Sequence, residues 1–257
     1  FQFRVFVSPV GPYFKGGVKP LTLRISDFDR AAPRGTGHIK AGLNYAMSLH
    51  AIVDAHNKGF GVEVLQDSSL TWVLMRFAVE IESRPEQYAD IEIDTWISDF
   101  NRLASTRNFR MRIGDKVIAS GVSQWCVLNM ETRQAADMST MKEAHDRFIV
   151  AEPSPIAAPA RLRPVQTTAS ISRPVVYSDI DFNRHMNTLR YIDLIFDTLP
   201  LEQFEKGDAM RLDINFLAEA RYGEVVSVGY LDVDNTRQFE ITSDAEKVLC
   251  RAKVEFK

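Results

Sequence analysis

Cysteine, unbalanced charge and long apolar runs are all scarce in this sequence of 257 residues. The two cysteines, Cys126 and Cys250, are too few for a disulfide framework and form no C-x-x-C pair, which favours a reduced protein without a zinc site. Lysine and arginine number 31 against 34 acidic residues, so no overall basic field holds nucleic acid or an anionic membrane. No stretch reaches the roughly 18 apolar residues of a membrane span, and the first residues lack a signal-peptide pattern. We therefore expect a soluble, cytoplasmic protein without nucleic-acid or membrane partners.

The apolar residues, 45% of the chain, are concentrated in segments that are typical of strands. These segments are rich in Val, Ile, Thr, Trp and Phe, and Gly114-Asp115 predicts a short hairpin turn between two of them. The expected strands are 70–82, 90–99, 103–113, 116–129, 166–177, 210–220, 224–234, 237–243 and 247–256.

Four prolines between residues 151 and 164 forbid a helix there and predict an interdomain linker. The first domain would then span 1–150 and the second 165–257. The halves share short matches, which indicate an internal duplication: Tyr88-Ala89-Asp90 with Tyr222-Gly223-Glu224, Thr106–Phe109 with Thr236–Phe239, and Lys116-Val117-Ile118 with Lys247-Val248-Leu249.

Each half also has one amphipathic segment that predicts a helix. In 188–198 and just beyond, an apolar stripe recurs at three or four residues, formed by Leu189, Ile192, Ile195, Phe196 and Leu199. Residues 38–58 have a similar stripe, and Gly59 supplies a carboxyl-terminal cap. We expect an α+β fold in which each half is an antiparallel sheet wrapped around one long helix.

The densest polar segment, 177–187, lies directly before the second predicted helix. Strand-like alternation would place Asp181, Asn183, His185 and Asn187 on one side of an extended segment. His185 can transfer protons near neutral pH, and a helix start offers free N–H groups to a developing oxyanion. Asn187 either caps the helix or acts directly in catalysis.

A calcium site is the competing interpretation of the same segment. Asp179, Asp181 and Asn183 match the first three ligand positions of a calcium loop, but Arg184 and Arg190 occupy the sixth and twelfth positions. We therefore expect no metal.

The residues from Asp181 to Tyr191 resemble the Asp-x-Asn-x-His-x-Asn-x-x-(Lys/Arg)-Tyr signature of acyl-acyl carrier protein thioesterases. The resemblance covers about 200 residues, from about 58 to 257. Other landmarks of that family are matched by Gly59-Phe60-Gly61, Thr71-Trp72-Val73-Leu74, Arg107-Asn108-Phe109 and the Glu of Asn215–Ala220. The resemblance implies two tandem hotdog domains.

The same resemblance implies a catalytic network of Asp181, Asn183, His185 and Glu219. Ala220 stands where plant members often have a cysteine, so water, and not a thiol, is expected to attack the thioester. Backbone N–H groups near Asn187 and Thr188 would hold the carbonyl oxygen. Glu80 is the expected first-half equivalent of Glu219, but no Asp-x-Asn-x-His motif precedes it. We therefore expect one active site per chain.

A second resemblance covers about the first 59 residues. Val5–Phe14, Arg30–Pro33 and Lys40–Tyr45 resemble branched-chain aminotransferases, in which the Lys of Lys-Ala-Gly-x-Asn-Tyr carries pyridoxal phosphate. Lys40 would then be the cofactor lysine and Tyr45 a ring contact, but the phosphate cradle of that much longer family is missing. We interpret this region as a fused or exchanged segment, with Lys40 a solvated residue, and expect no cofactor. A pyridoxal phosphate aminotransferase fragment is the remote alternative.

The expected function is hydrolysis of a fatty acyl-acyl carrier protein thioester, which ends chain elongation. Carrier proteins are acidic, so clustered cations are expected to guide docking, and the candidates are Arg161, Arg163, Arg184 and Arg190. Two alternatives stay open: an acyl-CoA thioesterase, and a hotdog scaffold that binds acyl chains without cleaving them. A homodimer is also left open.

Overall fold

The structure is a computed structural model that describes residues 69–86, 89–181, 184–205, 207 and 209–257. The helix expected at 38–58, Lys40, and the aminotransferase-like start all lie outside the described residues. The structure therefore describes the sheet, the second helix and most of the candidate site residues.

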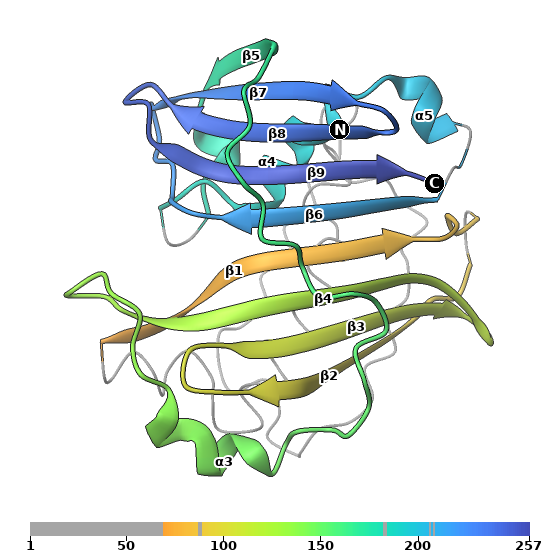
Figure 1. The fold of residues 1–257 in the computed structure, drawn as a ribbon, viewed down its shortest axis with the longest axis vertical. Coiled ribbons are helices and arrows are strands. Elements are labelled where there is room, and N and C mark those ends of the chain that lie inside the picture. The colour runs from red at the N-terminus through yellow and green to blue at the C-terminus, as the bar shows by residue number, and fades with distance from the viewer. Residues whose placement is uncertain (1–68, 87–88, 182–183, 206, 208) are drawn as a thin grey trace, which may run out of the picture. The chain divides into compact units, whose positions relative to one another are not determined.

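In the described part of the chain, nine strands form one continuous antiparallel sheet (Figure 1). Every strand predicted from the sequence is present, with ends that differ by a few residues. The strands are β1 (Leu70–Ile81), β2 (Glu92–Phe100), β3 (Ser105–Ile113), β4 (Lys116–Asn129), β5 (Ala169–Pro174), β6 (Met210–Phe216), β7 (Val225–Val233), β8 (Thr236–Ser243) and β9 (Val248–Phe256). Short helices are α3 (Lys142–Asp146), α5 (Leu201–Glu205) and the 3₁₀ turns Ser139–Met141 and Tyr177–Asp179.

The strand order supports the internal duplication. The sheet runs β2-β3-β4-β1-β6-β9-β8-β7-β5, so β1 pairs with the last strand of its half, β4, as β6 does with β9. The two halves meet where β1 pairs with β6, from Arg76 opposite Asn215 to Ile81 opposite Met210. The hairpin predicted at Gly114-Asp115 joins β3 to β4, and Gly114 takes a positive φ of 56° there.

The second predicted helix is α4 (Thr188–Phe196), which packs on one face of the second half. Ile195 and Leu199 of the predicted stripe are buried, but the centre of the buried face also includes Tyr191 and Leu194, which the stripe left out. The helix therefore presents a face turned slightly from the expected one, and it packs against Leu212, Ile214 and other apolar residues of β6 to β9.

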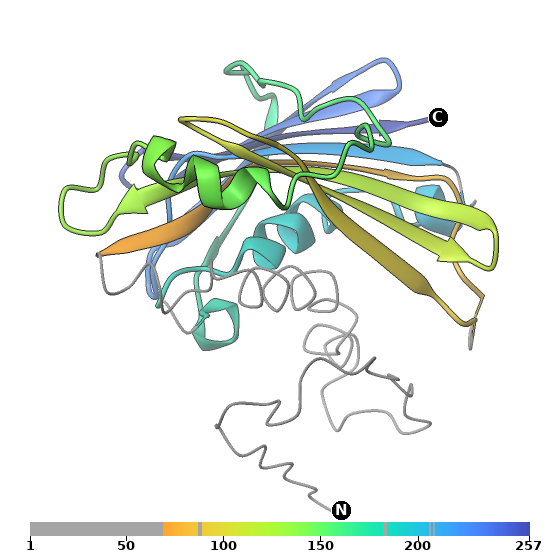
Figure 2. The ribbon, with the colours of Figure 1, turned by 90° about the horizontal axis from the view of Figure 1, so that it is seen from below.

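The proline-rich segment 151–164 has no helix or strand and runs along the opposite face of the sheet from α4 (Figure 2). It is fastened by side chains of β6: the Ala160 N–H donates to Asp213 Oδ1 at 2.8 Å, and the Leu162 N–H donates to Asn215 Oδ1 at 2.9 Å. Because neighbouring strand residues point to opposite faces, Leu212 and Ile214 face α4 while Asp213 and Asn215 face this segment. The division into two domains at 151–164 stays a prediction, since the sheet continues across both halves.

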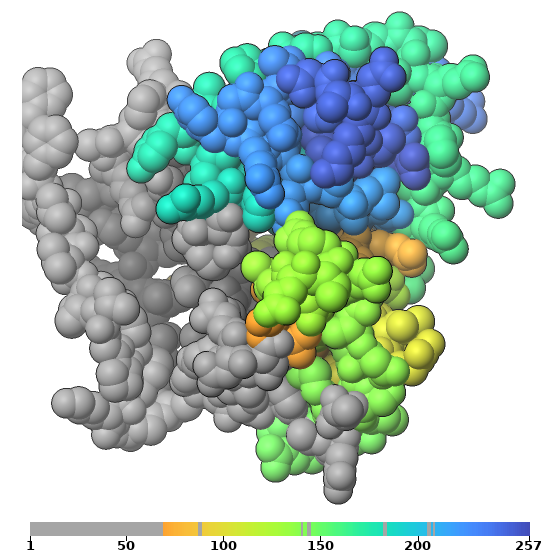
Figure 3. Space-filling model, turned by 90° about the vertical axis from the view of Figure 1, so that its left-hand side faces the viewer, coloured from red at the N-terminus to blue at the C-terminus, as the bar shows by residue number. Residues whose placement is uncertain are grey.

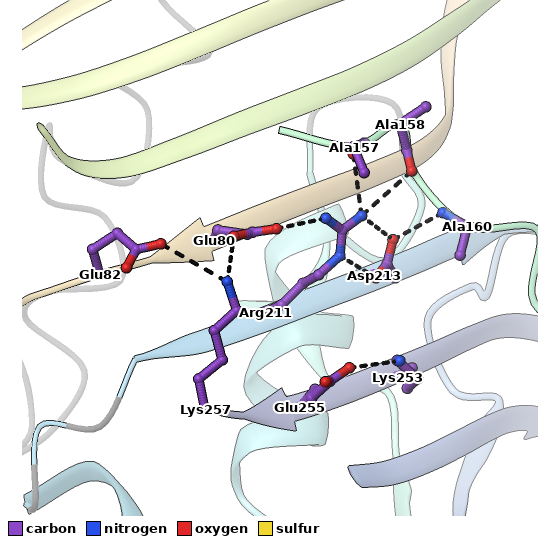
Figure 4. Close-up of polar contacts among 10 residues, drawn as sticks. All are labelled: Glu80, Glu82, Ala157, Ala158, Ala160, Arg211, Asp213, Lys253, Glu255 and Lys257. Atoms are coloured by element: carbon purple, nitrogen blue, oxygen red, sulfur yellow. Dashed lines mark hydrogen bonds and ion pairs between the residues drawn. The ribbon is translucent and has the colours of Figure 1, made fainter. Parts of the chain in front are cut away.

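A cluster of charged side chains joins the two halves beside this segment (Figure 4). Arg211 of β6 binds Glu80 of β1 at 2.7 Å and Asp213 at 2.7 Å, and it also donates to the carbonyl oxygens of Ala157 and Ala158. Lys257 binds Glu80 as well; its hydrogen bond and that of Arg211 outweigh burial and hold the pKa of Glu80 below its usual value. The cluster thus links both halves, the proline-rich segment and the last described residue.

The position of Glu80 corrects one expectation. Glu219 lies in the segment that follows β6, whereas Glu80 lies within β1, opposite Arg211 in the sheet. Glu80 is therefore not the structural equivalent of Glu219, and its side chain serves the contact between the halves.

Candidate active site

The polar segment before α4 folds into a tight turn and not into the extended segment that alternation predicted. The Asp181 N–H donates to the His185 carbonyl at 3.0 Å, the His185 N–H donates to Asp181 Oδ1 at 3.4 Å, and Ile180 pairs with Met186. Arg184 takes a φ of 63°, which reverses the chain. Backbone groups that bond to one another across such a turn outweigh side-chain alternation. Asn183 lies outside the described residues.

Asn187 caps α4. Its side-chain oxygen accepts the Leu189 N–H at 2.9 Å, while its own N–H donates to the Asp179 carbonyl at 2.8 Å. Both the side-chain oxygen and the N–H of Asn187 are thus bonded within the protein and are not left to bind a substrate. These bonds favour the capping alternative. Among the described residues none accepts the N–H of Thr188, so this group is the better candidate for holding an oxyanion.

The carboxylate of Asp179 is buried beneath the turn and holds the preceding residues in place through hydrogen bonds. Its side chain is 3% exposed, and it accepts two hydrogen bonds from Arg173, at 2.7 and 2.9 Å, and one from the Val176 N–H at 2.8 Å. Arg190 Nε lies 3.7 Å away. Burial opposes ionisation, but these donors outweigh it, so the pKa of Asp179 lies below its usual value.

Asp179→Asn is expected to lower the free energy of unfolding by about 3 kcal/mol at pH 7, because the variant removes one partner of a largely buried ion pair. The Asp179 pKa is lowered on folding, so its contribution is complete above the unfolded pKa of about 3.9 and is lost as pH falls through the folded value. Urea unfolding at pH 7 and pH 3.5 measures both effects. A difference between variant and parent that stays constant over this range would contradict the role of the carboxylate charge.

His185 and Glu219, which the sequence separates by α4, α5 and β6, meet at the start of α4. His185 Nε2 lies 3.4 Å from Glu219 Oε2, and the two side chains are 20% and 38% exposed. His185 also pairs through its backbone with Arg221, and the Met186 N–H donates to the Ala220 carbonyl at 2.8 Å. The segment after β6 is therefore tied directly to the turn that carries His185.

Tyr191 secures the same segment from within the core. Tyr191 belongs to α4, and its side chain is buried in the core. Its hydroxyl oxygen accepts the Ala220 N–H at 3.0 Å. Burial raises the pKa of this phenol, so Tyr191 stays neutral and acts as a structural hydrogen-bond partner. The position of Glu219 is thus fixed by two neighbours in the chain: Ala220, which is bonded to Tyr191 of α4, and the end of β6.

A residue that sequence reasoning missed also reaches the site. Arg133, in the turn after β4, donates from Nη2 to Glu219 Oε2 at 2.7 Å. No spacing or motif connects this turn with the second half, and the contact depends on how β1 and β6 join the halves. A single sequence carries no signal that would have found it.

The four candidate docking arginines do not lie together. Arg184 is exposed in the turn that holds His185, whereas Arg161 and Arg163 belong to the segment on the opposite face of the sheet from α4. The side chain of Arg190 is 13% exposed and bonded to Asp193 and to the Ser178 carbonyl. Arg184 is therefore the candidate that the geometry favours, and Arg190 holds the turn in place.

The two cysteines are free and buried, and burial raises the pKa of both thiols. Neither is placed to act as a nucleophile. In the described residues, no group of three or more His, Cys, Asp or Glu side chains is arranged to hold a metal ion. None of the helices described here has the length and apolar content needed to cross a membrane.

Comparisons with known proteins identify the family of the chain and its fold. The acyl-ACP thioesterase N-terminal domain matches residues 37–144, and the acyl-ACP thioesterase C-terminal domain matches residues 163–257. An acyl-ACP thioesterase from Bacteroides thetaiotaomicron superposes with a TM-score of 0.73 at 31% identity, covering 85% of this chain and 90% of that chain. The chloroplastic oleoyl-acyl carrier protein thioesterase 1 of Arabidopsis thaliana is 23% identical over 202 residues, which is 73% of this chain and 54% of that protein.

The chain spans about half the length of the curated thioesterases that it matches. A shorter similarity, 59% identity over 49 residues, links it to a branched-chain-amino-acid aminotransferase of Haemophilus influenzae, across 19% of this chain and 14% of that protein. The second resemblance noted in the sequence is thus confirmed as a local one.

Proposed function

The chain belongs to the acyl-ACP thioesterase family, and from this membership we propose that it hydrolyses fatty acyl-acyl carrier protein thioesters to free fatty acid and carrier protein. The observation that carries the proposal is the placement of His185 Nε2 3.4 Å from Glu219 at the start of α4. A proton-transfer group, an orienting carboxylate and an open helix N–H are the parts that acyl transfer to water needs.

In the mechanism that we propose, the Nε2–H of His185 points to Glu219, and Nδ1 takes a proton from water. No described residue bonds to Nδ1. The resulting hydroxide attacks the thioester carbonyl, and the Thr188 N–H holds the oxyanion. The tetrahedral intermediate then expels the carrier thiolate, which receives the proton back from His185. Asp181 and Asn187 hold the turn and the start of α4 in place. Asn183 is a member of the catalytic network, as the family resemblance implies.

Water is the nucleophile in this proposal because no thiol is available. Ala220 occupies the position that follows Glu219, and it is fully buried. The buried free thiols are consistent with a reduced compartment such as the cytoplasm, which stays our proposal.

Carrier-protein recognition is expected to depend on salt, because an acidic partner must dock beside exposed arginines. kcat/KM for acyl-acyl carrier protein should fall steeply between about 0.05 and 0.5 M salt, as the screening length shortens through about 8 Å. Among the four candidate arginines, Arg184→Gln should cause the largest loss, since Arg184 is exposed in the turn that carries His185. Arg161→Gln, on the opposite face, should cause a smaller one.

Turnover of matched carrier-protein and coenzyme A thioesters discriminates the proposal from its acyl-CoA alternative. A short neutral thioester serves as control, and its hydrolysis should change little with salt. Equal or faster turnover of the coenzyme A ester, with a flat salt response for the carrier-protein ester, would favour the alternative. Sedimentation of the same preparation tests the homodimer, which stays a prediction.

A further inference from the structure

One oxygen of Glu219 is contacted from both halves of the sheet. Arg133 Nη2 lies 2.7 Å from Oε2, and His185 Nε2 lies 3.4 Å from the same atom. In Figure 3, the green turn after β4 lies beside the blue segment that follows β6. We propose that Arg133 is a positioning residue for the thioesterase reaction: it holds the Glu219 carboxylate against His185, so that the first half completes the active site.

The turn that carries Arg133 is fixed by its own hydrogen bonds. Asn129 Oδ1 accepts the N–H groups of Glu131 and Thr132 at 2.9 and 2.8 Å, and the Asn129 carbonyl accepts the Arg133 N–H at 2.9 Å. Ser69 adds a bond from its hydroxyl to Glu131 at 2.9 Å. The backbone of Arg133 is therefore held in place before its side chain meets Glu219.

Folding stability alone does not account for this arrangement. The side chains of Arg133 and Glu219 are 50% and 38% exposed, and ion pairs at such exposure contribute little to the free energy of unfolding. Arg133 also has a φ of 57°, in the left-handed region that residues other than glycine rarely adopt. The turn's own hydrogen bonds hold this conformation, so the exposed contact with Glu219 is not needed to fold the turn, which favours a role in the site.

The chemistry explains why an arginine suits this place. A guanidinium stays charged at any working pH, so it cannot take part in proton transfer. Next to Glu219 it pairs with the carboxylate, and it fixes Oε2 at 3.4 Å from Nε2 of His185. Nδ1 of His185 is then left as the proton acceptor. The inference rests on the proposed hydrolysis and assigns to Arg133 the control of the His185 tautomer.

Steady-state kinetics of Arg133→Gln and Arg133→Lys test the inference, with Arg102→Gln as matched control. Arg102 forms an exposed ion pair with Asp137 at 3.4 Å in the same half, and its described contacts include neither His185 nor Glu219. With acyl-acyl carrier protein as substrate, Arg133→Gln should lower kcat by about 10- to 100-fold, the loss that misplacement of a reacting group causes. KM should stay within about twofold of the parent, since substrate binding is not disturbed. Arg133→Lys should recover much of the loss, because an ammonium group also pairs with the carboxylate.

The split between kcat and KM, measured beside thermal unfolding, separates positioning from a general structural effect. Thermal unfolding of both variants should stay within about 2 °C of the parent. A kcat within about twofold of the parent in Arg133→Gln, or a rise in KM with kcat unchanged, would overturn the inference.

Nitrogen NMR of the His185 ring tests the inference without a measurement of turnover. The signal is assigned with His185→Gln, and the parent should show the Nε2-protonated tautomer, whereas Arg133→Gln should show a mixture of the two tautomers. Identical tautomer populations in the two proteins would overturn the inference. Absence of thioester hydrolysis by the parent, in contrast, would contradict the proposed function. The tautomer populations measured by NMR would then still test whether Arg133 positions His185.

Discussion

His185→Ala and Glu219→Gln are each expected to lower kcat by about 10²- to 10⁴-fold, the range that one general acid–base group contributes. In the structure the two side chains contact each other, and neither belongs to the buried core. Their loss should therefore affect the reaction and leave thermal unfolding nearly unchanged. Because both residues act as one unit, the double variant should lose less than the product of the two single losses.

Glu92→Gln is the matched control for these variants. Glu92 is an exposed carboxylate in β2 that pairs with Arg112 at 3.1 Å, so its loss should leave kcat unchanged. Turnover near that of the parent in either His185→Ala or Glu219→Gln would remove the proposed network. A large fall in unfolding temperature would assign the lost activity to misfolding.

Arg211→Met is expected to have the largest effect on stability, about 3–5 kcal/mol in the free energy of unfolding. Arg211 is 13% exposed and pairs with Asp213, whose side chain is 2% exposed, and with Glu80, at 17% (Figure 4). Removal of the guanidinium leaves two shielded carboxylates close together and frees the carbonyl groups of Ala157 and Ala158. Urea unfolding at pH 7 measures the change.

Lys253→Met is the control for Arg211→Met, because Lys253 lies in the neighbouring strand β9 and pairs with Glu255 at 2.8 Å. The two side chains of that pair are about one-third exposed, so its loss should cost less than about 1 kcal/mol. Equal small effects of the two variants would mean that the Arg211 cluster does not hold the halves together.

The sheet could be predicted from the sequence because its strands alternate or are rich in β-branched and aromatic residues. The strands 116–129 and 247–256, for example, appear as β4 and β9 with ends that differ by no more than one residue. The predicted strand 210–220 was too long, since β6 ends at Phe216 and the chain then turns to present Glu219. Strand propensity does not encode that break, which the contacts of Ala220 with Met186 and Tyr191 impose.

The site was predicted in part. The family resemblance named His185 and Glu219, and the structure brings them into contact, while Asn187 was left between capping and catalysis and is placed as a cap. Alternation failed for the segment around Asp181, because the backbone there bonds to itself across a turn. Arg133 could not be predicted, since its contact depends on the register between β1 and β6 and on the turn after β4.

The product balance with a purified fatty acyl-acyl carrier protein tests the central claim most directly. The parent protein should release one free fatty acid and one carrier thiol for each thioester consumed, measured together by mass spectrometry and a thiol reagent, and Glu219→Gln should release neither at a comparable rate. Binding of the acyl-carrier protein that leaves the thioester intact, in a parent protein shown to be folded, would contradict hydrolysis and favour a non-catalytic acyl-binding scaffold.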